Sequence, residues 1–395
     1  MPTILICNEL IDAGGLGTYT LSLAQGLKTR GWEIYFLVTH VTGEHYEDVK
    51  KITQRCYDLS SMPLSLRKLE AAKDIVIEVA PNILLLNHCS LMHYVLPYLV
   101  PRIKPVALLH NDVDLLYRVA SLYDKWIFRW IAPSQALAEH FLAYIKRDYQ
   151  KRIRVIQHGV DSSLFFEGSR TTDSKMIKIS FIGHIGENKG ADIVPDIIEL
   201  IVKRNASVDV TIAGHGEMRS LLEHRFKEKK IPVTLLDYIR PEIVSGILRN
   251  TDILLLPTRV EGFGLIIIEA MLCGVVPVVS RLDGITTNIV QHGTTGYLPE
   301  MDDIKGFADS IIGLMERPEL LRQMSRNAAA DAQKRFSLQN MIGEYERIFF
   351  EDDDRTSVAQ RGKVGWLIET ASEIVKKKQN KRKLLMLRSM WRMLR

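Results

Sequence analysis

The sequence predicts an α/β fold made of two doubly wound, parallel-sheet domains that face each other across a cleft. Two observations lead to this prediction. Short apolar runs alternate with segments of helical periodicity along most of the chain, as in strands joined by helices on both faces of a sheet. The chain also has 395 residues, more than one hydrophobic core usually serves, so two domains are expected.

The apolar runs divide into two sets, and a segment without periodicity separates them. Residues 159–175 are rich in Ser, Thr and Gly, which predicts a linker. We therefore expect a Rossmann-like N-terminal domain at 1–165 and a Rossmann-like C-terminal domain at 166–335. The predicted strands are residues 3–7, 34–38, 82–86, 105–109 and 154–157 in the first set, and 177–183, 208–214, 233–237, 252–257 and 275–280 in the second.

Two segments follow the second domain. Residues 336–352 have a helical pattern that would suit packing on either domain, including a return to the N-terminal one. Residues 353–395 are predicted to be a helical extension with a basic tail.

Composition indicates a globular protein of a reducing compartment. Apolar residues make up 46% and charged residues 25%, and no apolar run is long enough to span a bilayer. The segment MPTILICNEL is expected to be a core strand rather than a signal peptide, which predicts a cytoplasmic protein. The four cysteines are widely spaced, which argues against a zinc site or a disulfide framework.

The basic residues are concentrated at one end. Residues 376–395 hold nine Lys or Arg and no acid, and without them the formal charge of +5 would be −4. On a helical wheel, apolar side chains that include Trp391 lie on one side and basic ones on another. This pattern favours peripheral binding to an anionic membrane surface, on its inner face. A helix packed on the protein or a partner, and a solvated tail, are the alternatives, while nucleic acid is not expected without a recognition fold.

A glycine-rich loop follows the first predicted strand and opens a helix. Gly14, Gly15 and Gly17 would let the backbone approach a ligand, and the helix N-terminus favours a negative group. Tight-turn chemistry alone is the alternative. The loop is not G-x-G-x-x-G, which argues against a dinucleotide site and a nucleotide-dependent dehydrogenase.

Two basic residues follow predicted strands and should therefore face the cleft. Lys189 stands at a helix entrance, where a cation suits the helix dipole only if an anion shares the site. His110 follows the strand at 105–109. A solvated loop lysine and a structurally satisfied histidine are the alternatives.

The stretch RVEGFGLIIIEAM (259–271) places two glutamates differently. Glu261 lies in the loop after a buried strand, at the cleft, whereas Glu269 lies inside an apolar helix that begins near Gly264. A buried carboxylate requires hydrogen-bond donors or takes up a proton. Sugar or ribose hydroxyls would supply such donors, and so would a neighbouring Arg or Lys.

Together these segments resemble a known family. GENKG, IAGHGEM, EGFGLIIIEAMLCGVVPVVS and HGTTGYL are similar to donor-side motifs of retaining glycosyltransferases with the GT-B fold, in glycosyltransferase family 4, or group 1. AGGLGTY, HND and HGVD provide a looser match in the N-terminal half.

The resemblance implies a role for each candidate. Lys189 would bind the donor diphosphate, together with helix-end amides at Gly264 and Leu265, and Glu269 would accept from ribose hydroxyls. Glu261 and His110 would contact the transferred sugar from opposite domains. Gly15 and Gly17 would lie against the phosphates or the acceptor.

The sequence also departs from the family pattern. His184 stands where the family usually has an arginine on the diphosphate, and Asn288 where many members have glutamate. Because histidine titrates near neutrality and arginine does not, donor affinity or turnover should fall as pH rises. Arg259 and Arg281 are candidates to compensate.

The implied function is retaining transfer of a sugar from a nucleotide-diphosphate-sugar to an acceptor hydroxyl. No metal and no cofactor beyond the donor substrate are expected. Membrane binding by the basic tail would favour a glycan or lipid-linked acceptor, in cell-surface polysaccharide, lipopolysaccharide or glycolipid synthesis. A small soluble acceptor, and a sugar-nucleotide-binding protein without catalysis, are the alternatives.

Overall fold

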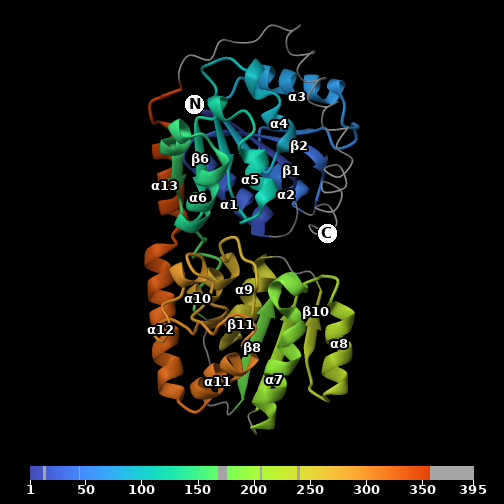
Figure 1. The fold of residues 1–395 in the computed structure, drawn as a ribbon, viewed down its shortest axis with the longest axis vertical. Coiled ribbons are helices and arrows are strands. Elements are labelled where there is room, and N and C mark those ends of the chain that lie inside the picture. The colour runs from blue at the N-terminus through green and yellow to red at the C-terminus, as the bar shows by residue number, and fades with distance from the viewer. Residues whose placement is uncertain (12–14, 44, 168–175, 205–206, 238–240, 356–395) are drawn as a thin grey trace.

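The chain forms two stacked domains (Figure 1). The computed structural model describes residues 1–11, 15–43, 45–167, 176–204, 207–237 and 241–355. The N-terminal domain, blue to green, lies above the C-terminal domain, green to orange. Among these residues no helix is both long and apolar enough to cross a membrane.

A seven-stranded parallel sheet forms the N-terminal domain. Its strand order is β3-β2-β1-β4-β5-β6-β7, so the chain builds outward in opposite directions from β1 and β4. Ligands of open α/β sheets bind at such a switch point, outside the strands' C-terminal ends. The strands are β1 (Thr3–Leu10), β2 (Glu33–Val41), β3 (Arg55–Asp58), β4 (Ile83–Asn87), β5 (Lys104–Leu108), β6 (Arg129–Ala132) and β7 (Ile153–Val155).

A five-stranded parallel sheet forms the C-terminal domain, with the order β10-β9-β8-β11-β12 and a switch point between β8 and β11. Its strands are β8 (Ile177–Ile182), β9 (Val208–Ala213), β10 (Thr234–Leu236), β11 (Ile253–Leu256) and β12 (Val276–Val279). The predicted class, two doubly wound α/β domains, is confirmed.

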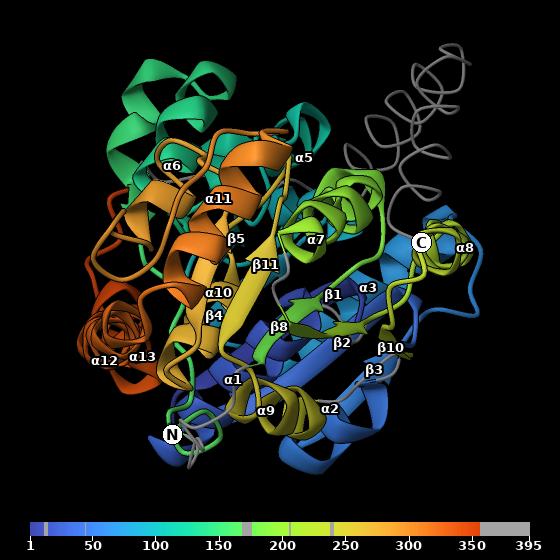
Figure 2. The same cartoon turned by 90° about the horizontal axis from the view of Figure 1, so that it is seen from below.

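Helices cover both faces of each sheet, which is why the central strands are apolar on both sides. All residues of β4 and β11 are buried. In Figure 2, seen from below, α7 and α11 lie next to each other near β11. The helices are α1 (Gly15–Thr29), α2 (Tyr46–Ile52), α3 (Leu66–Val79), α4 (Ser90–His93), α5 (Asp114–Ala120), α6 (Gln135–Phe141), α7 (Val194–Lys203), α8 (Arg219–Glu228), α9 (Pro241–Arg249), α10 (Leu265–Leu272), α11 (Ile304–Met315), α12 (Pro318–Arg335) and α13 (Leu338–Phe349).

The predicted strand set lacks β3 and β6. Strand β3 is a sheet edge with one buried residue, Tyr57, and so has no apolar run to detect. Strand β6 is wholly buried but begins with Arg129, a charge that interrupts its apolar pattern. The arginine can be buried because two carboxylates from the other end of the chain pair with it.

Helix α13 packs on the N-terminal domain, although it follows the C-terminal one. Its buried residues join the same core as α1, and a Cβ on Gly26 would meet the Ile342 side chain. The Tyr345 hydroxyl hydrogen-bonds the Tyr19 hydroxyl of α1. Figures 1 and 2 show α12 and α13 in succession along one side of the molecule.

The two crossings between the domains run side by side. Val160, on the first crossing, forms a parallel bridge with Ser337 on the second. Its amide donates to the Phe336 carbonyl at 2.9 Å, and its carbonyl accepts from the Leu338 amide at 3.3 Å. Two hydrogen-bonded segments of the chain therefore join the domains.

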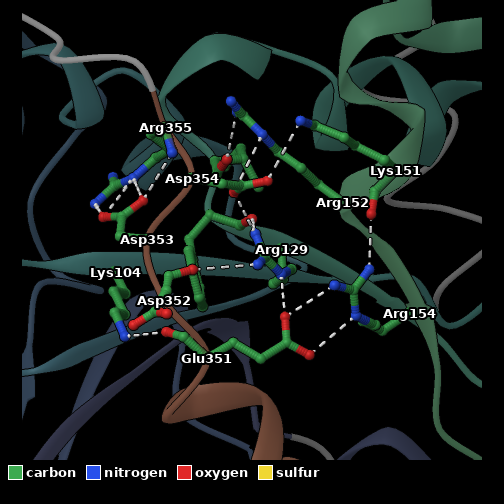
Figure 3. Close-up of polar contacts among 12 residues, drawn as sticks. Lys104, Arg129, Lys151, Arg152, Arg154, Glu351, Asp352, Asp353, Asp354 and Arg355 are labelled. Carbon is green, nitrogen blue, oxygen red and sulfur yellow. Dashed lines mark hydrogen bonds and ion pairs between the residues drawn. The ribbon is translucent and has the colours of Figure 1, made fainter.

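Residues 351–355, here called the acidic strap, follow α13 and contact Lys104, Arg129 and Arg154, which belong to β5, β6 and β7 (Figure 3). Glu351 pairs with Arg129 at 2.7 Å and with Arg154 at 2.9 Å, and Asp354 pairs with Arg129 at 2.7 Å. Residues 353–355 of the predicted helical extension are not helical. Residues 356–395, with the predicted basic tail, lie outside the described residues.

Candidate active site

Loops from the two domains meet at the C-terminal ends of both sheets. The rings of His158 and Phe263, one from each domain, have centroids 4.7 Å apart. A Cβ on Gly262 would collide with the His110 carbonyl oxygen, so only glycine fits there. This close approach brings the loop that carries Glu261 against the loop that carries His110.

The glycine-rich loop approaches the same region. Helix α1 begins at Gly15, and a Cβ on this residue would lie 3.7 Å from Leu265 Cδ1 at the start of α10. Gly17 is buried in the first turn of α1. Gly14, with residues 12 and 13, lies outside the described residues.

Lys189 and Glu261 form an ion pair. The Lys189 ammonium donates to Glu261 Oε2 at 2.7 Å and to the Val260 carbonyl at 3.2 Å. Their side chains are 20% and 12% exposed, so a ligand can reach the pair. Lys189 ends a single 3-10 turn, and α7 begins at Val194, further along than the helix entrance that the sequence predicted.

Backbone contacts fix the two loops that carry this pair. The Asn188 carbonyl accepts from the Arg259 amide at 2.9 Å and the Val260 amide at 3.1 Å. Gly190 has a φ of 67°, and a Cβ there would collide with the Pro257 carbonyl. The loops after β8 and β11 are thus held as one unit.

Arg259 also holds these loops in place through ion pairs. Its guanidinium makes two bonds to Asp192, at 2.7 and 2.8 Å, and one to Asp302 at 2.8 Å. The hydrogen bonds that Arg259 donates to Asp192 raise the pKa of Arg259 and lower the pKa of Asp192. Both candidates to compensate for His184 have carboxylate partners, since Arg281 pairs with Asp283 at 3.1 Å.

Glu269 lies inside α10, where every residue from Ile267 to Leu272 is buried. Its side chain is 9% exposed, and burial raises the pKa of its carboxyl to about 7. Within the described residues its carboxylate makes no hydrogen bond or ion pair. No neighbouring Arg or Lys in the described residues therefore accounts for this buried carboxylate. The other alternative is that its hydrogen-bond donors are hydroxyls of a ligand.

His184 follows β8, and its Nε2 lies 2.9 Å from Glu217 Oε2 in the loop after β9. Both groups remain partly exposed, at 28% and 64%. A Cβ on Gly186 would crowd both side chains. The imidazole is thus held at the end of the sheet by a carboxylate that an arriving anion would repel.

His110 is one of three imidazoles packed together in the N-terminal domain. Its ring centroid lies 5.0 Å from that of His88 and 5.7 Å from that of His158. Burial, and then the charges of the other two, hold the pKa of His110 well below its ordinary value. Burial also lowers the pKa of His88 to about 4 and that of His158 to about 3. The three rings are neutral at physiological pH.

Sequence reasoning did not single out the residues around His110. Asn87 ends β4, and its amide oxygen lies 2.7 Å from His110 Nε2. His88 follows with a φ of 49°, which is unusual for a residue other than glycine. A signal was available in the sequence. Asn87 and His88 directly follow a buried apolar run, in the same way that His110 follows the apolar run of β5.

The comparisons with known proteins agree with this arrangement. The model of Glycosyltransferase Family 4 matches residues 13–164, and that of Glycosyl transferases group 1 matches residues 165–331. Two Rossmann-like domains that face each other form the GT-B fold, and both matched families are glycosyltransferases. The chain belongs to the group 1 glycosyltransferases, family 4.

The curated relatives carry glycosyltransferase names. The chain is 27% identical to N-acetyl-alpha-D-glucosaminyl L-malate synthase of Bacillus anthracis, over 86% of this chain and 94% of the relative. It is 28% identical to D-inositol 3-phosphate glycosyltransferase of Pseudarthrobacter chlorophenolicus, over 52% of this chain and 51% of the relative.

Solved structures show the same fold. Anabaena HepE, in complex with UDP and glucose, superposes with a TM-score of 0.75 at 18% identity, over 88% of this chain and 99% of HepE. S. aureus TarM superposes with a TM-score of 0.75 at 12% identity, over 89% of this chain and 99% of TarM.

Proposed function

We propose that the protein transfers a sugar from a nucleoside-diphosphate sugar to an acceptor hydroxyl, with retention of configuration and without a metal ion. The observation that most supports the nucleotide site is Glu269, a buried carboxylate without a partner in the described residues. A ribose diol can donate two hydrogen bonds to it. Lys189 and Glu261 lie in the adjoining loops, where Lys189 binds the diphosphate and Glu261 contacts the sugar.

The chemistry depends on charge at the leaving group. As the glycosidic bond breaks, negative charge develops on the diphosphate and positive charge on the sugar. Lys189, His184 and the N–H groups at the start of α10, of Gly264 and Leu265, stabilise the phosphate. Glu261 lies beside the positive sugar, where its carboxylate lowers the energy of the oxocarbenium-like state.

Retention follows if the acceptor attacks from the face that the diphosphate leaves. The departing phosphate oxygen then takes the proton of the acceptor hydroxyl, and the new glycosidic bond forms on that same face. His110 contacts the sugar from the other domain. Because burial lowers its pKa, the imidazole is a weak base, and it holds the sugar ring rather than taking the proton of the acceptor.

A donor panel tests the assignment. Thermal unfolding in the presence of UDP-, GDP-, ADP- and dTDP-sugars identifies a donor by the rise in unfolding temperature that a ligand of the native state produces. NMR of the transferred or hydrolysed sugar then reports its anomeric configuration, and EDTA should leave the rate unchanged. Donor binding with no turnover on any acceptor would instead support the non-catalytic sugar-nucleotide-binding protein.

We further propose a glycan or lipid-linked acceptor, in cell-surface polysaccharide, lipopolysaccharide or glycolipid synthesis, with the protein on the inner membrane face. The basic residues 376–395 support this proposal by their sequence alone. Sedimentation with vesicles of phosphatidylglycerol, compared with phosphatidylcholine, tests it. Equal recovery with both vesicles, or binding that survives replacement of Lys381, Arg388 and Arg392 by Gln, would contradict it and favour a small soluble acceptor.

A further inference from the structure

A chain of buried hydrogen bonds leads from His110 to the backbone of α1. His110 Nε2 lies 2.7 Å from Asn87 Oδ1, and Asn87 Nδ2 donates to Thr20 Oγ1 at 2.6 Å. Thr20 Oγ1 in turn donates to the Leu16 carbonyl at 2.7 Å. Asn87 and Thr20 are each 1% exposed, so water does not compete for these groups.

The chain has a direction that follows from its last member. The Thr20 hydroxyl has one hydrogen, and the Leu16 carbonyl can only accept it. Thr20 therefore faces Asn87 with a lone pair, and the Asn87 group beside it must be the NH2. The Asn87 oxygen then faces His110, so that Nε2 must carry the ring proton. Because burial keeps His110 neutral, Nδ1 is left as a pure acceptor.

The reverse arrangement is chemically possible but makes fewer bonds. A flipped Asn87 would donate to His110 Nε2, and Thr20 would turn its hydrogen from Leu16 to Asn87. Two side-chain hydrogen bonds would then replace three, among groups that are buried from solvent. The observed direction is therefore the stable one.

We propose that Asn87 and Thr20 are positioning residues that fix His110 as the Nε2–H tautomer, so that Nδ1 accepts a hydrogen bond from a hydroxyl of the transferred sugar. This inference rests on the proposed function. It also defines a substrate class, because a lone pair attracts a hydroxyl and repels a carboxylate. Neutral sugars are accepted at this position, and uronic acids with a carboxylate in place of that hydroxyl are rejected.

The tautomer can be measured on the protein without any donor. In the full chain labelled with 15N-histidine, two-bond proton–nitrogen correlations distinguish a protonated from an unprotonated ring nitrogen, and the signal lost in His110→Ala assigns His110. We expect an unprotonated Nδ1 in the wild type. In Thr20→Val, which keeps the shape but removes the acceptor for Asn87, both tautomers should appear, whereas Thr20→Ser should keep the wild-type spectrum. A protonated Nδ1 in the wild type, or an unchanged Thr20→Val spectrum, would overturn the proposal.

The sugar preference gives a second readout. For a UDP-hexose and its UDP-uronic acid, the wild type should favour the hexose in kcat/KM. Thr20→Val should lower that ratio about tenfold, the value of roughly one net hydrogen bond, and Thr20→Ser should restore it. An equal ratio in wild type and Thr20→Val contradicts the role in specificity. If no nucleotide sugar is turned over but Nδ1 is unprotonated, the proposed function fails and the positioning by Asn87 and Thr20 stands.

Discussion

Lys189 is held by Glu261 at 2.7 Å, so the cation assigned to the donor diphosphate is paired with the carboxylate assigned to the sugar. A donor that brings its own phosphate charge competes for this lysine. As Lys189 turns to the phosphate, Glu261 is released toward the sugar. The ion pair thus keeps both groups in place, and solvated charges need not be stripped of water when the donor arrives.

Replacing Lys189 by Met should lower kcat/KM about 10²- to 10³-fold, because a preorganised donor to the developing phosphate charge is lost. Steady-state kinetics at saturating acceptor measures it. Lys305→Met, which removes an exposed lysine paired within its own helix, is the matched control and should change little. A loss of less than threefold in Lys189→Met would be inconsistent with phosphate binding by this residue.

Glu261→Gln should reduce kcat far more than the affinity for the donor. The amide keeps the size and a hydrogen-bond acceptor for Lys189, but it removes the negative charge beside the cationic sugar. Single-turnover rates with a radiolabelled donor separate the two effects. Turnover close to that of the wild type would refute the electrostatic role of Glu261.

Glu269 should make stability depend on pH. Burial raises its pKa from the ordinary 4.5 to about 7, so the folded chain binds this proton more tightly than the unfolded chain does. The free energy of unfolding should then decrease as pH rises from 4.5 to 7, by about 3 kcal/mol. Urea unfolding at pH 5 and 8 should show this loss in the wild type but not in Glu269→Gln. Exposed Glu316→Gln is the control and should behave as the wild type.

The same titration should couple to donor binding in the opposite sense. Ribose hydroxyls require the ionised Glu269 as acceptor, so donor affinity should rise with pH up to about 7. Calorimetry in buffers of different ionisation enthalpy should detect a proton released on binding below that pH. No such release in the wild type, or an equal release in Glu269→Gln, would show that Glu269 does not bind the donor.

His184→Arg should tighten donor binding, because an arginine offers a planar, permanently charged fork that can bond two phosphate oxygens. His184 Nε2 lies 2.9 Å from Glu217 Oε2, and the ring centroid of His215 lies 5.9 Å from that of His184. Calorimetric titration of the donor into the wild type and into His184→Arg measures the change. An affinity that is unchanged in His184→Arg would argue that His184 does not bind phosphate.

Much of the fold could be predicted because its strands are continuous apolar runs between helical segments. The exceptions have physical causes that lie outside the local pattern. Strand β6 begins with Arg129, whose burial depends on Glu351, far along the chain. The amphipathic pattern of α13 indicates that one face is buried but does not identify the surface that covers it.

The candidate site could be predicted only in part. Lys189, Glu261 and Glu269 attracted notice because they follow strands or interrupt an apolar helix. The contact of Lys189 with Glu261, and that of His184 with Glu217, depend on how loops from separate strands meet. Asn87 and Thr20 carry no motif, and their part emerges only from the direction of hydrogen bonds in the folded interior.

The return of α13 to the N-terminal domain affects how the protein is made. The N-terminal domain leaves the ribosome before α13 does. The contacts of Tyr19 with Tyr345 and of Trp32 with Phe349 therefore cannot form until residues 345–349 have been synthesised. The N-terminal domain can therefore complete its core only after the C-terminal domain has been synthesised. A chaperone would be needed most during this interval.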